Sequence, residues 1–393
     1  MRVLYCALDQ HVPGTLGGSV HVESVANGLA ALGHDVHVAT QPGAGWPGGR
    51  VTWHAMGPPF GQHVLRWART AAIRDLARRL SADVVMERYY NFGGEGIFAA
   101  ASLGIPAVLE VNAPVVDYPG SPKSRIDRAL LIEPMRRWRD RICRHVQLFV
   151  TTTADILPAW VDKQRVLEVE WGADIDHFHP QPAAAPPFTL DRSRIQCVFA
   201  GAFRSWHGVV HLSAALARLH ASGDHRFGAV FIGDGPERGA AERAARDVPG
   251  ILFTGALPHA ILPSALAAAD IGVAPFDPTR HAPLRLGFYW SPLKIYEYMA
   301  VGLPVVAPAL PRLGRLVDDG REGLLYDPLA PRALDRALVA LADVDVRRRM
   351  GAAARERVVR DFSWTAHCRA LDERLRALVR AHGAGRTEQK AHA

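Results

Sequence analysis

Short runs of valine, isoleucine, leucine and alanine alternate along the chain with longer segments whose apolar positions recur every three or four residues. Short apolar runs bounded by glycine, proline or polar residues are typical of strands buried in a parallel sheet, and the longer segments are typical of amphipathic helices. The runs predicted to be strands are 3–8, 36–39, 51–55, 83–86, 107–111, 148–152, 195–200, 229–232, 251–254, 271–275 and 303–307. This alternation predicts an α/β fold with doubly wound sheets.

The alternation stops once, near the middle of the chain. Residues 181–187 are rich in proline and alanine and have no apolar period, and the strand pattern restarts at residue 195. A chain of 393 residues is long enough for two domains of ordinary size. The predicted organisation is a first domain at 1–180, a linker at 181–190, a second domain at 191–362, a last helix at 363–381 and a disordered tail at 382–393.

The segment from Gly287 to Pro308 has the clearest local signals. Ser291 followed by Pro292 predicts a helix start, with the serine as N-cap and the proline in the first turn. The helix continues through Leu293 and stops at Gly302, before an apolar strand. Lys294 lies in the first turn, so the helix N-terminus and this lysine together predict an anion site.

Glu297 follows Lys294 by one helical turn, so the two side chains share a face. This spacing has two interpretations. The pair can form an ordinary i,i+3 salt bridge on the helix surface. Alternatively, Lys294 holds a phosphate while the two oxygens of Glu297 accept hydrogen bonds from a sugar diol.

Glycine-rich turns also follow predicted strands elsewhere. Gly17 and Gly18 precede the first helix, where open α/β sheets bind ligands, although two adjacent glycines are weak evidence alone. A second loop, 201–208, contains Arg204 and His207, and Gly235 lies in a third turn. Arg204 can bind the same anion or be a surface charge, and neutral His207 is expected to donate one hydrogen bond.

Polar residues at two other strand ends are candidates for a site in the first domain. Glu110 and Asn112 lie at the end of the strand at 107–111, and Arg88 and Tyr89 follow the strand at 83–86. Glu110 and Asn112 can belong to a catalytic site or merely cap a strand end. Arg88 and Tyr89 are candidates for contact with a second substrate.

The most basic segment is 123–145, with seven arginines against three acidic residues and with several apolar residues among them. A basic amphipathic helix can lie on an anionic membrane, can be the solvated face of a domain, or can contact a soluble substrate. The net charge of +7 and a pI of about 9.5 fit an anionic ligand or an anionic membrane surface. We expect no nucleic-acid partner.

Composition narrows the remaining possibilities. No run of 18 uncharged apolar residues predicts a transmembrane helix, and the N-terminus resembles a first strand more than a signal peptide. The four scattered cysteines predict reduced, buried thiols in a cytoplasmic protein. We expect no metal site, because there is no cluster of metal ligands and no Asp-x-Asp triplet. A nicotinamide dehydrogenase is disfavoured, because no Gly-x-Gly-x-x-Gly follows the first strand.

The pattern Ser-Pro-Leu-Lys-x-x-Glu-Tyr-Met-Ala-x-Gly-x-Pro-Val-Val at 291–306 resembles the donor-site segment of GT-B glycosyltransferases of family 4. The glycine loop at 17–21, the turn at 233–236 and the segment 171–180 are similar to the same family. The resemblance implies two Rossmann-like domains facing across a cleft, with the last helix crossing back to the first domain. It also implies retaining transfer from a nucleotide sugar, with Glu297 on the ribose of the donor.

The chain departs from the family pattern in four places, one of which is Trp171, where the family's segment has an asparagine. His207 stands where a lysine usually binds the diphosphate, Tyr289 stands where a first glutamate is usual, and Glu110 to Pro114 stand where a functional histidine is often found. The sugar-side contacts are therefore the least certain part of the predicted site.

The resulting hypothesis is a retaining, metal-independent hexosyltransferase without a cofactor. The acceptor is unidentified and can be lipid-linked, with the enzyme in the cytoplasm or at the inner face of the membrane. The alternatives are a nucleotide-sugar epimerase of the same fold and a non-catalytic sugar-nucleotide-binding protein. The predicted site residues are Glu110 and Asn112 for catalysis, Arg88 and Tyr89 for the acceptor, and Gly17, Gly18, Arg204, His207, Gly235, Ser291, Pro292, Leu293, Lys294 and Glu297 for the donor.

Overall fold

The computed structural model describes residues 1–391 except 15, 16, 44, 119 and 183. The chain forms two compact units. Unit 1 contains residues 1–171, 289–291 and 364–393, and unit 2 contains residues 172–288 and 292–363. The predicted linker at 181–190 therefore falls inside unit 2, and the first boundary lies at residue 171 rather than 180.

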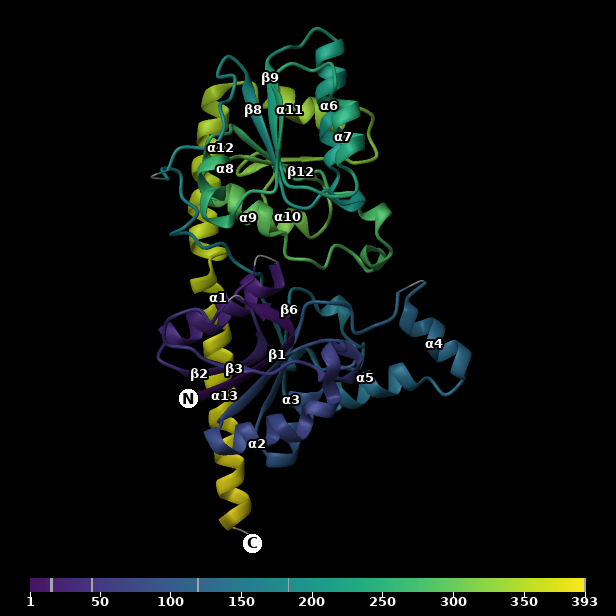
Figure 1. Ribbon diagram of the computed structural model, residues 1–393, viewed down its shortest axis with the longest axis vertical. Coiled ribbons are helices and arrows are strands. Elements are labelled where there is room, and N and C mark those ends of the chain that lie inside the picture. Colours follow the sequence, from purple (N-terminus) through teal and green to yellow (C-terminus); the bar gives the residue numbers. More distant parts are fainter. Residues whose placement is uncertain (15–16, 44, 119, 183, 392–393) are drawn as a thin grey trace. The chain divides into compact units, whose positions relative to one another are not determined.

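Unit 1 is built on a seven-stranded parallel sheet with the order β3-β2-β1-β4-β5-β6-β7 (Figure 1). The order reverses between β1 and β4, so the sheet is doubly wound, as the alternation predicted. Its strands are β1 (Arg2–Val12), β2 (Asp35–Pro42), β3 (Thr52–Ala55), β4 (Val84–Arg88), β5 (Ala107–Val111), β6 (Leu148–Thr151) and β7 (Val166–Glu168).

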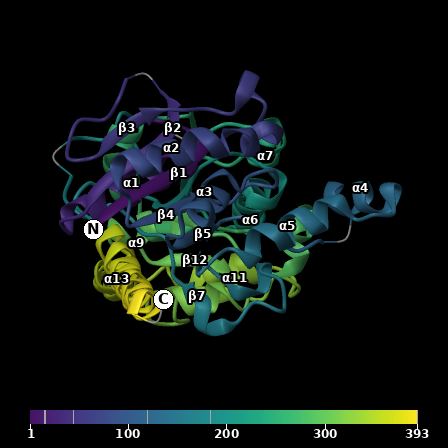
Figure 2. The ribbon, with the colours of Figure 1, turned by 90° about the horizontal axis from the view of Figure 1, so that it is seen from below.

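Several helices of unit 1, such as α1 and α3, bury apolar residues and contact the strands of this sheet. Helix α13 belongs to this unit and packs against α1, where Leu371 and Leu375 join a core formed with the valines of β1 and α1. Figure 2 shows α4 and α5 extending away from the sheet. The helices are α1 (Gly17–Ala31), η1 (Pro59–Gly61), η2 (His63–Arg69), α2 (Thr70–Leu80), α3 (Glu95–Leu103), α4 (Pro122–Leu130), α5 (Pro134–Arg144), η3 (Ala154–Ile156), η4 (Lys163–Arg165) and α13 (Trp364–Ala391).

Unit 2 contains a six-stranded parallel sheet with the order β10-β9-β8-β11-β12-β13. Phenylalanines of β8 and β9 pack with leucines of α6 and α11 in one core cluster, which explains why these strands were recognisable as apolar runs. The strands are β8 (Ile195–Ala200), β9 (Phe227–Ile232), β10 (Ile251–Gly255), β11 (Ile271–Val273), β12 (Val305–Pro308) and β13 (Gly323–Tyr326).

The helices of unit 2 include one long, strongly charged helix that the apolar pattern did not predict. Helix α12 buries few residues, among them Met350, Ala354 and Val358, so its apolar period is weak. The helices are η5 (Ser205–His207), α6 (Val209–Ala221), α7 (Arg238–Ala244), η6 (His259–Ile261), α8 (Leu262–Ala267), η7 (Pro278–Arg280), η8 (Ala282–Leu286), α9 (Leu293–Ala300), α10 (Leu313–Leu316), α11 (Ala333–Ala340) and α12 (Val344–Asp361).

The prediction of a disordered tail at 382–393 is wrong for most of its length. Helix α13 continues through this segment to Ala391, and residues 392–393 lie outside the described residues. The sequence from 382 onward is short of large apolar residues, but it is rich in residues that a helix tolerates and contains no proline.

Candidate active site

Two turns, 201–208 and 233–236, meet at the carboxyl ends of β8 and β9 in unit 2. Gly233 has a φ of +134°, and a Cβ at this position would lie 2.0 Å from the carbonyl oxygen of Gly201. Gly235 has a φ of +153°, and a Cβ there would lie 2.8 Å from the carbonyl oxygen of Phe203. Only glycine permits both conformations and both contacts. The predicted glycine turns are therefore packed against each other, with Gly235 supporting the 201–208 loop.

Lys294 lies next to this pair of turns, in the first turn of α9. Its ammonium is buried and has no hydrogen-bond partner among the described residues. The nitrogen lies 3.9 Å from the ring centroid of Phe199 and 5.3 Å from that of Phe276. A Cβ built on Gly201 would be 3.4 Å from the same nitrogen. A buried cation without an anionic partner is costly, so this arrangement favours an anion ligand that the protein does not supply.

Glu297 does not neutralise Lys294 directly. No ion pair within 4 Å joins the two side chains in the part of the chain that the structure describes, so the salt-bridge interpretation is not supported. Burial lowers the pKa of Lys294 to about 7, although the charge of Glu297 opposes this. Burial likewise raises the pKa of Glu297 to about 7, against the opposing effect of Lys294. Both side chains are therefore poised to change charge near neutral pH when a ligand arrives.

His207 does not have the role that the sequence predicted. Its Nδ1 lies 2.6 Å from the carbonyl oxygen of Ala202, so this nitrogen carries the proton and donates. Burial lowers the pKa of His207 to about 3, with a further contribution from the charge of Lys294. The neutral ring thus offers only an accepting Nε2, and it cannot donate a hydrogen bond to a phosphate. Arg204 is exposed and lies over the ring of Trp206 at 5.4 Å, which leaves its guanidinium accessible to an anion.

The helix start at Ser291 was predicted incorrectly. Helix α9 begins at Leu293, and Pro292 is the preceding residue, with a φ of −84° and a ψ of 80°. The Ser291 hydroxyl instead donates to the carboxylate of Glu170 at 3.0 Å and accepts from the backbone N–H of Trp171 at 3.0 Å. Ser291 belongs to unit 1, so its hydroxyl is used within that unit and does not cap the helix.

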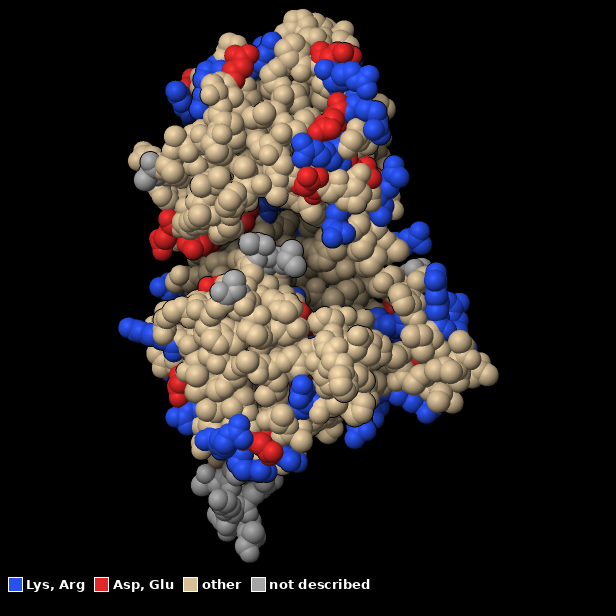
Figure 3. Space-filling model, in the orientation of Figure 1, with Lys and Arg blue, Asp and Glu red and all other residues tan. Residues whose placement is uncertain are grey.

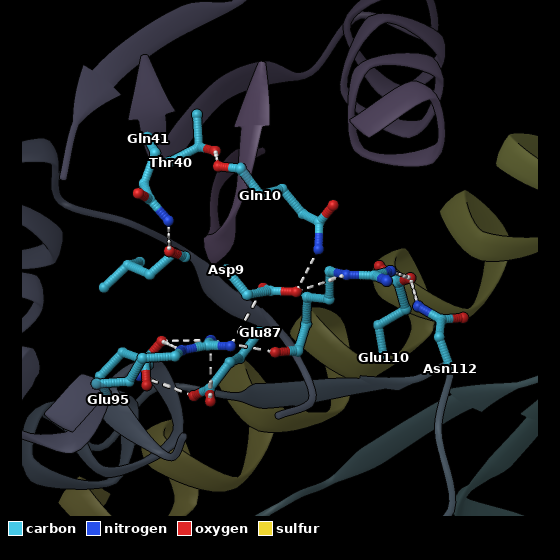
Figure 4. Close-up of polar contacts among 12 residues, drawn as sticks. Asp9, Gln10, Thr40, Gln41, Glu87, Glu95, Glu110 and Asn112 are labelled. Atoms are coloured by element: carbon cyan, nitrogen blue, oxygen red, sulfur yellow. Dashed lines mark hydrogen bonds and ion pairs between the residues drawn. The ribbon is translucent and has the colours of Figure 1, made fainter. Parts of the chain in front are cut away.

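The polar centre of unit 1 is Glu110, near the end of β5. One carboxylate oxygen lies 2.5 Å from Nε2 of His21 and 3.5 Å from the guanidinium of Arg88, and the other accepts from the Tyr5 hydroxyl. The Asn112 amide also donates to Glu110 (Figure 4). These partners hold the pKa of Glu110 well below its ordinary value even though burial opposes them. An ionised carboxylate with both oxygens occupied is a weak general base, so the geometry favours a positioning role for Glu110.

Asn112 connects Glu110 to an aromatic cluster that the sequence analysis did not assign to the site. Its side-chain oxygen accepts from the indole N–H of Trp171 at 3.1 Å. The His21 ring lies 4.2 Å from the Trp171 ring and 5.2 Å from the Trp364 ring. His21 is fully buried, on the first turns of α1. Its position four residues after Gly17, in the glycine loop, could have marked His21 as a site candidate. Nothing in a single sequence showed that its ring would contact Glu110.

Arg88 and Tyr89 do not offer free groups to an acceptor. The Arg88 side chain lies 3.2 Å from Asp9 as well as 3.5 Å from Glu110, so it is part of the internal network. Tyr89 is only 4% exposed, and burial raises the pKa of its hydroxyl. The predicted acceptor contact is therefore not supported for Tyr89, because the residue after β4 turns its ring into the core.

A second buried network supports the first. The Arg66 side chain is fully buried and contacts Glu95, Asp9 and Glu87, the last at 3.7 Å. Glu87 accepts from the backbone N–H groups of residues 94, 96 and 97, at the start of α3. These contacts fix the ends of β1 and β4, which carry Asp9 and Arg88.

The first glycine loop is only partly described. Helix α1 begins at Gly17, and residues 15 and 16 lie outside the described residues. A Cβ on Gly18 would lie 2.3 Å from the side-chain oxygen of Gln10, the end of a flexible side chain that can move aside. The prediction that Gly17 and Gly18 contact the donor stays a prediction.

Two protein-family models match most of the chain. The model described as Glycosyl transferase 4-like domain matches residues 17–166, and the model described as Glycosyl transferases group 1 matches residues 194–343. The chain belongs to the group 1 glycosyltransferases. The family assignment places it among glycosyltransferases rather than epimerases or dehydrogenases, and its two parallel α/β sheets are those of the GT-B fold.

Relatives of this glycosyltransferase span nearly its whole length. A GDP-mannose-dependent alpha-mannosyltransferase of Corynebacterium glutamicum is 26% identical over 94% of this chain and 87% of its own. A phosphatidyl-myo-inositol mannosyltransferase of Mycobacterium leprae is 25% identical over 93% of this chain and 94% of its own. The structure of Anabaena HepE in complex with UDP-glucose superposes with a TM-score of 0.68 and 16% identity, over 96% of this chain and all of HepE.

The described residues of the glycosyltransferase form neither a membrane-spanning helix nor a cluster of metal ligands. Among the described residues, no helix is long and apolar enough to cross a membrane. The same residues contain no group of three or more His, Cys, Asp or Glu side chains that could hold a metal ion.

Proposed function

We propose that this glycosyltransferase transfers a hexose, with retention of anomeric configuration, from a nucleotide diphosphate sugar to an acceptor hydroxyl. The observation that carries the proposal is the buried ammonium of Lys294, which has no hydrogen-bond partner among the described residues and lies beside Gly201 and the N-terminus of α9. This place offers positive charge and a close backbone approach to a diphosphate. The printed names of the relatives, a GDP-mannose-dependent enzyme and a UDP-glucose complex, support a donor of this class.

The proposed chemistry breaks the bond between the anomeric carbon and the diphosphate oxygen and forms a bond from that carbon to the acceptor oxygen. The proton of the acceptor hydroxyl passes to an oxygen of the departing diphosphate, so no protein base is required. Lys294 and Arg204 stabilise the negative charge that develops on the leaving group. Retention is supported by the family resemblance alone.

Glu297 is proposed to bind the ribose of the donor. It lies one turn after Lys294 on the same face of α9, and within the described part of the chain its carboxylate makes no ion pair with that lysine. Two carboxylate oxygens can each accept from one of two vicinal hydroxyls. The ribose is then held one helical turn from the diphosphate.

The acceptor is proposed to be a hydroxyl compound that can be lipid-linked, encountered at the cytoplasmic face of a membrane. The name of the Mycobacterium leprae relative, which transfers to a phosphatidyl-inositol, supports this class. The four cysteines are all buried and free, in agreement with a reducing compartment.

The proposed function is tested by screening the full chain for thermal shifts with GDP, UDP and ADP and with the corresponding nucleoside diphosphate hexoses. The best donor is then incubated with and without candidate acceptors, and the products are analysed by NMR. We expect slow donor hydrolysis that releases the α-sugar from an α-linked donor. Release of the C2 epimer would identify an epimerase, and stabilisation without turnover would identify a binding protein.

We expect transfer to be independent of added metal ions. The proposed charge stabilisation comes from Lys294, Arg204 and the α9 N-terminus, so 5 mM EDTA should change the rate by less than about twofold. Rates are measured with the best donor after dialysis against EDTA and again after adding Mg²⁺ or Mn²⁺. A loss of more than tenfold that either ion restores would contradict this prediction.

The substitution Glu297→Gln should weaken nucleoside diphosphate binding by about 10- to 100-fold at pH 8, as expected for the loss of charge-assisted hydrogen bonds. Because the pKa of Glu297 is raised to about 7, the wild-type side chain is largely neutral at pH 6, and the difference between the two proteins should shrink there. Titration calorimetry at pH 6 and pH 8 measures the effect. The exposed residue Glu356 provides a control through Glu356→Gln, and equal affinities of wild type and Glu297→Gln at pH 8 would exclude a ribose contact.

A further inference from the structure

The two helices α4 and α5 form a hairpin, and within it the polarity of α4 is reversed, whereas α5 buries Met135, Ile142 and Cys143. The buried residues of α4 are the charged side chains Lys123 and Asp127. Large apolar side chains of the same hairpin are exposed, including Leu131 at 86%. The exposed apolar residues are Ile126, Leu130, Leu131 and Ile132, and we call them the hairpin tip. A helix that buries its charges and exposes its aliphatic residues is adapted to a partner outside the chain.

The buried charges give the hairpin a fixed shape. Asp127 accepts from the backbone N–H groups of Met135 and Arg136, which are at the start of α5. Arg139 joins Asp117 at 2.8 Å and Asp127 at 3.7 Å. The Lys123 ammonium donates to the carbonyl oxygen of residue 114 at 2.7 Å. These hydrogen bonds and ion pairs of Lys123, Asp127 and Arg139 fix the base of the hairpin. The hairpin tip is therefore exposed because of this fixed geometry.

Exposed arginines surround the hairpin tip. They are Arg125, Arg128, Arg136 and Arg137, and Glu133 is the only exposed acidic side chain of the described residues between 122 and 139. Figure 3 shows the end of this hairpin, at the right edge of the view, as an uncharged surface with Lys and Arg atoms above and below it. Of the seven arginines in the basic segment, Arg139 is buried in the polar base and the other six remain exposed.

We propose that the hairpin tip docks this glycosyltransferase on an anionic phospholipid bilayer. The four aliphatic side chains enter the interface between headgroups and acyl chains, and the arginines contact lipid phosphates. Charge complementarity between the exposed arginines and anionic lipid headgroups favours a bilayer as the partner. A second copy of the chain would bring the same arginines together across a two-fold axis, where like charges repel. The inference deepens the proposed function, because it places a lipid-linked acceptor at unit 1.

The test uses flotation of the full chain with neutral phosphatidylcholine vesicles and with vesicles that contain 30% phosphatidylglycerol. We expect binding to the anionic vesicles at low salt, weaker binding at 0.5 M NaCl, and little binding to neutral vesicles. The double substitution Leu131→Ser and Ile132→Ser should reduce binding at least about tenfold. Its control is Leu329→Ser, because Leu329 is 88% exposed but lies in unit 2.

The arginines are tested separately. The pair Arg136→Gln and Arg137→Gln should lower binding more than about tenfold, at roughly fivefold for each arginine. The control pair is Arg348→Gln and Arg349→Gln, two adjacent exposed arginines on α12. Equal binding by the tip variants and wild type, or no binding of wild type to anionic vesicles, would overturn the proposal.

A fluorescence experiment reports on the position of the tip itself. All four native cysteines are buried, so a cysteine introduced by Leu131→Cys can be labelled selectively with an environment-sensitive dye. A blue shift with anionic vesicles, and quenching by lipids that carry a spin label near the headgroup, would support docking. Dye that stays in water, or a concentration-dependent dimer that Leu131→Ser dissolves, would overturn it.

Nucleoside diphosphate thermal shifts of every variant separate this inference from the proposed function. The tip variants should keep the wild-type shift, since the tip lies in unit 1 and the proposed diphosphate site lies in unit 2. If wild type binds vesicles but shows no thermal shift with any nucleotide, the docking proposal stands and the proposed function is wrong. If it shows a nucleotide shift but does not bind vesicles, the proposed function stands and the docking proposal is wrong.

Discussion

The substitution Lys294→Met should abolish most activity and raise the stability of the ligand-free protein. The loss in transition-state stabilisation is expected to be about 2–4 kcal/mol, or roughly 30- to 1000-fold in kcat/KM. Stability rises because the variant removes a buried ammonium that has no hydrogen-bond partner among the described residues. Methionine keeps an unbranched apolar side chain against Phe199 and Phe276, so the packing is retained.

The pH dependence of this gain follows from the pKa of Lys294, which burial lowers to about 7 from an ordinary value of 10.5. Well below pH 7 the lysine is charged in both the folded and the unfolded chain, so the folded state carries the full free-energy cost of the buried ammonium. As the pH rises from 7 toward 10.5, the unfolded chain binds more protons than the folded one, and the stability of wild type increases. The stability difference between the variant and wild type should therefore be largest near pH 6–7 and shrink by pH 9.

Thermal unfolding at pH 6, 7, 8 and 9, with and without nucleoside diphosphate, measures both effects. The control is Lys163→Met, because Lys163 is an exposed lysine of unit 1. It should change neither the unfolding temperature nor kcat/KM. A Lys294→Met protein that is less stable than wild type at pH 7 and still fully active would show that this lysine is a structural residue and not a phosphate ligand.

Most strands of both sheets could be predicted because burial on both faces leaves a signal within the strand's own sequence. Parallel strands covered on both faces are nearly continuous apolar runs, so β4, β5, β8 and β9 stood out in the sequence. Edge strand β13 has mostly half-buried residues and no such run, and it was not predicted. Helix α12 was missed for a similar reason, since few apolar residues interrupt its charged surface.

The two candidate sites differ in how far the sequence could describe them. In unit 2, Lys294 and Glu297 lie on one short helix, so their spacing along the chain gives their spacing in space. The packing of Gly233 on Gly201 also follows from turns at neighbouring strand ends. The N-cap at Ser291 was predicted wrongly because its hydroxyl donates to Glu170, which is 121 residues away. Rules for helix capping consider only neighbouring residues, so they could not include this hydrogen bond.

In unit 1 the site depends on contacts between residues that are far apart in sequence. Tyr5 and Glu110 are 105 residues apart, and they meet because the sheet order places β4 alone between β1 and β5. Asp9 lies where the register of β1 against β2 shifts, between Ala7 and His11, and this irregularity has no apolar signature. Strand ends could be predicted as polar, but their partners could not.

The substitution Glu110→Gln should both destabilise unit 1 and lower activity strongly. The wild-type carboxylate is ionised and buried, with His21 at 2.5 Å and Arg88 at 3.5 Å. Removing its charge leaves the Arg88 guanidinium with Asp9 as its remaining anionic partner, and breaking a buried pair costs about 3–5 kcal/mol. The loss of activity is expected to exceed tenfold, because Asn112 and Trp171 lose the group that orients them.

The pH dependence separates this effect from simple misfolding. The folded-state pKa of Glu110 is held below its ordinary value of 4.5, so its contribution to stability is complete above about pH 4.5 and is lost as the pH falls further. The difference in unfolding free energy between wild type and Glu110→Gln should therefore be constant from pH 7 to pH 5 and decrease below pH 4.5. The control is Glu373→Gln, on the exposed face of α13. Urea unfolding at pH 7, 5, 4 and 3.5 provides the measurement. If the difference is already absent at pH 7, Glu110 is not the ionised centre of this network, and the lost activity of the variant must come from direct contact with a substrate.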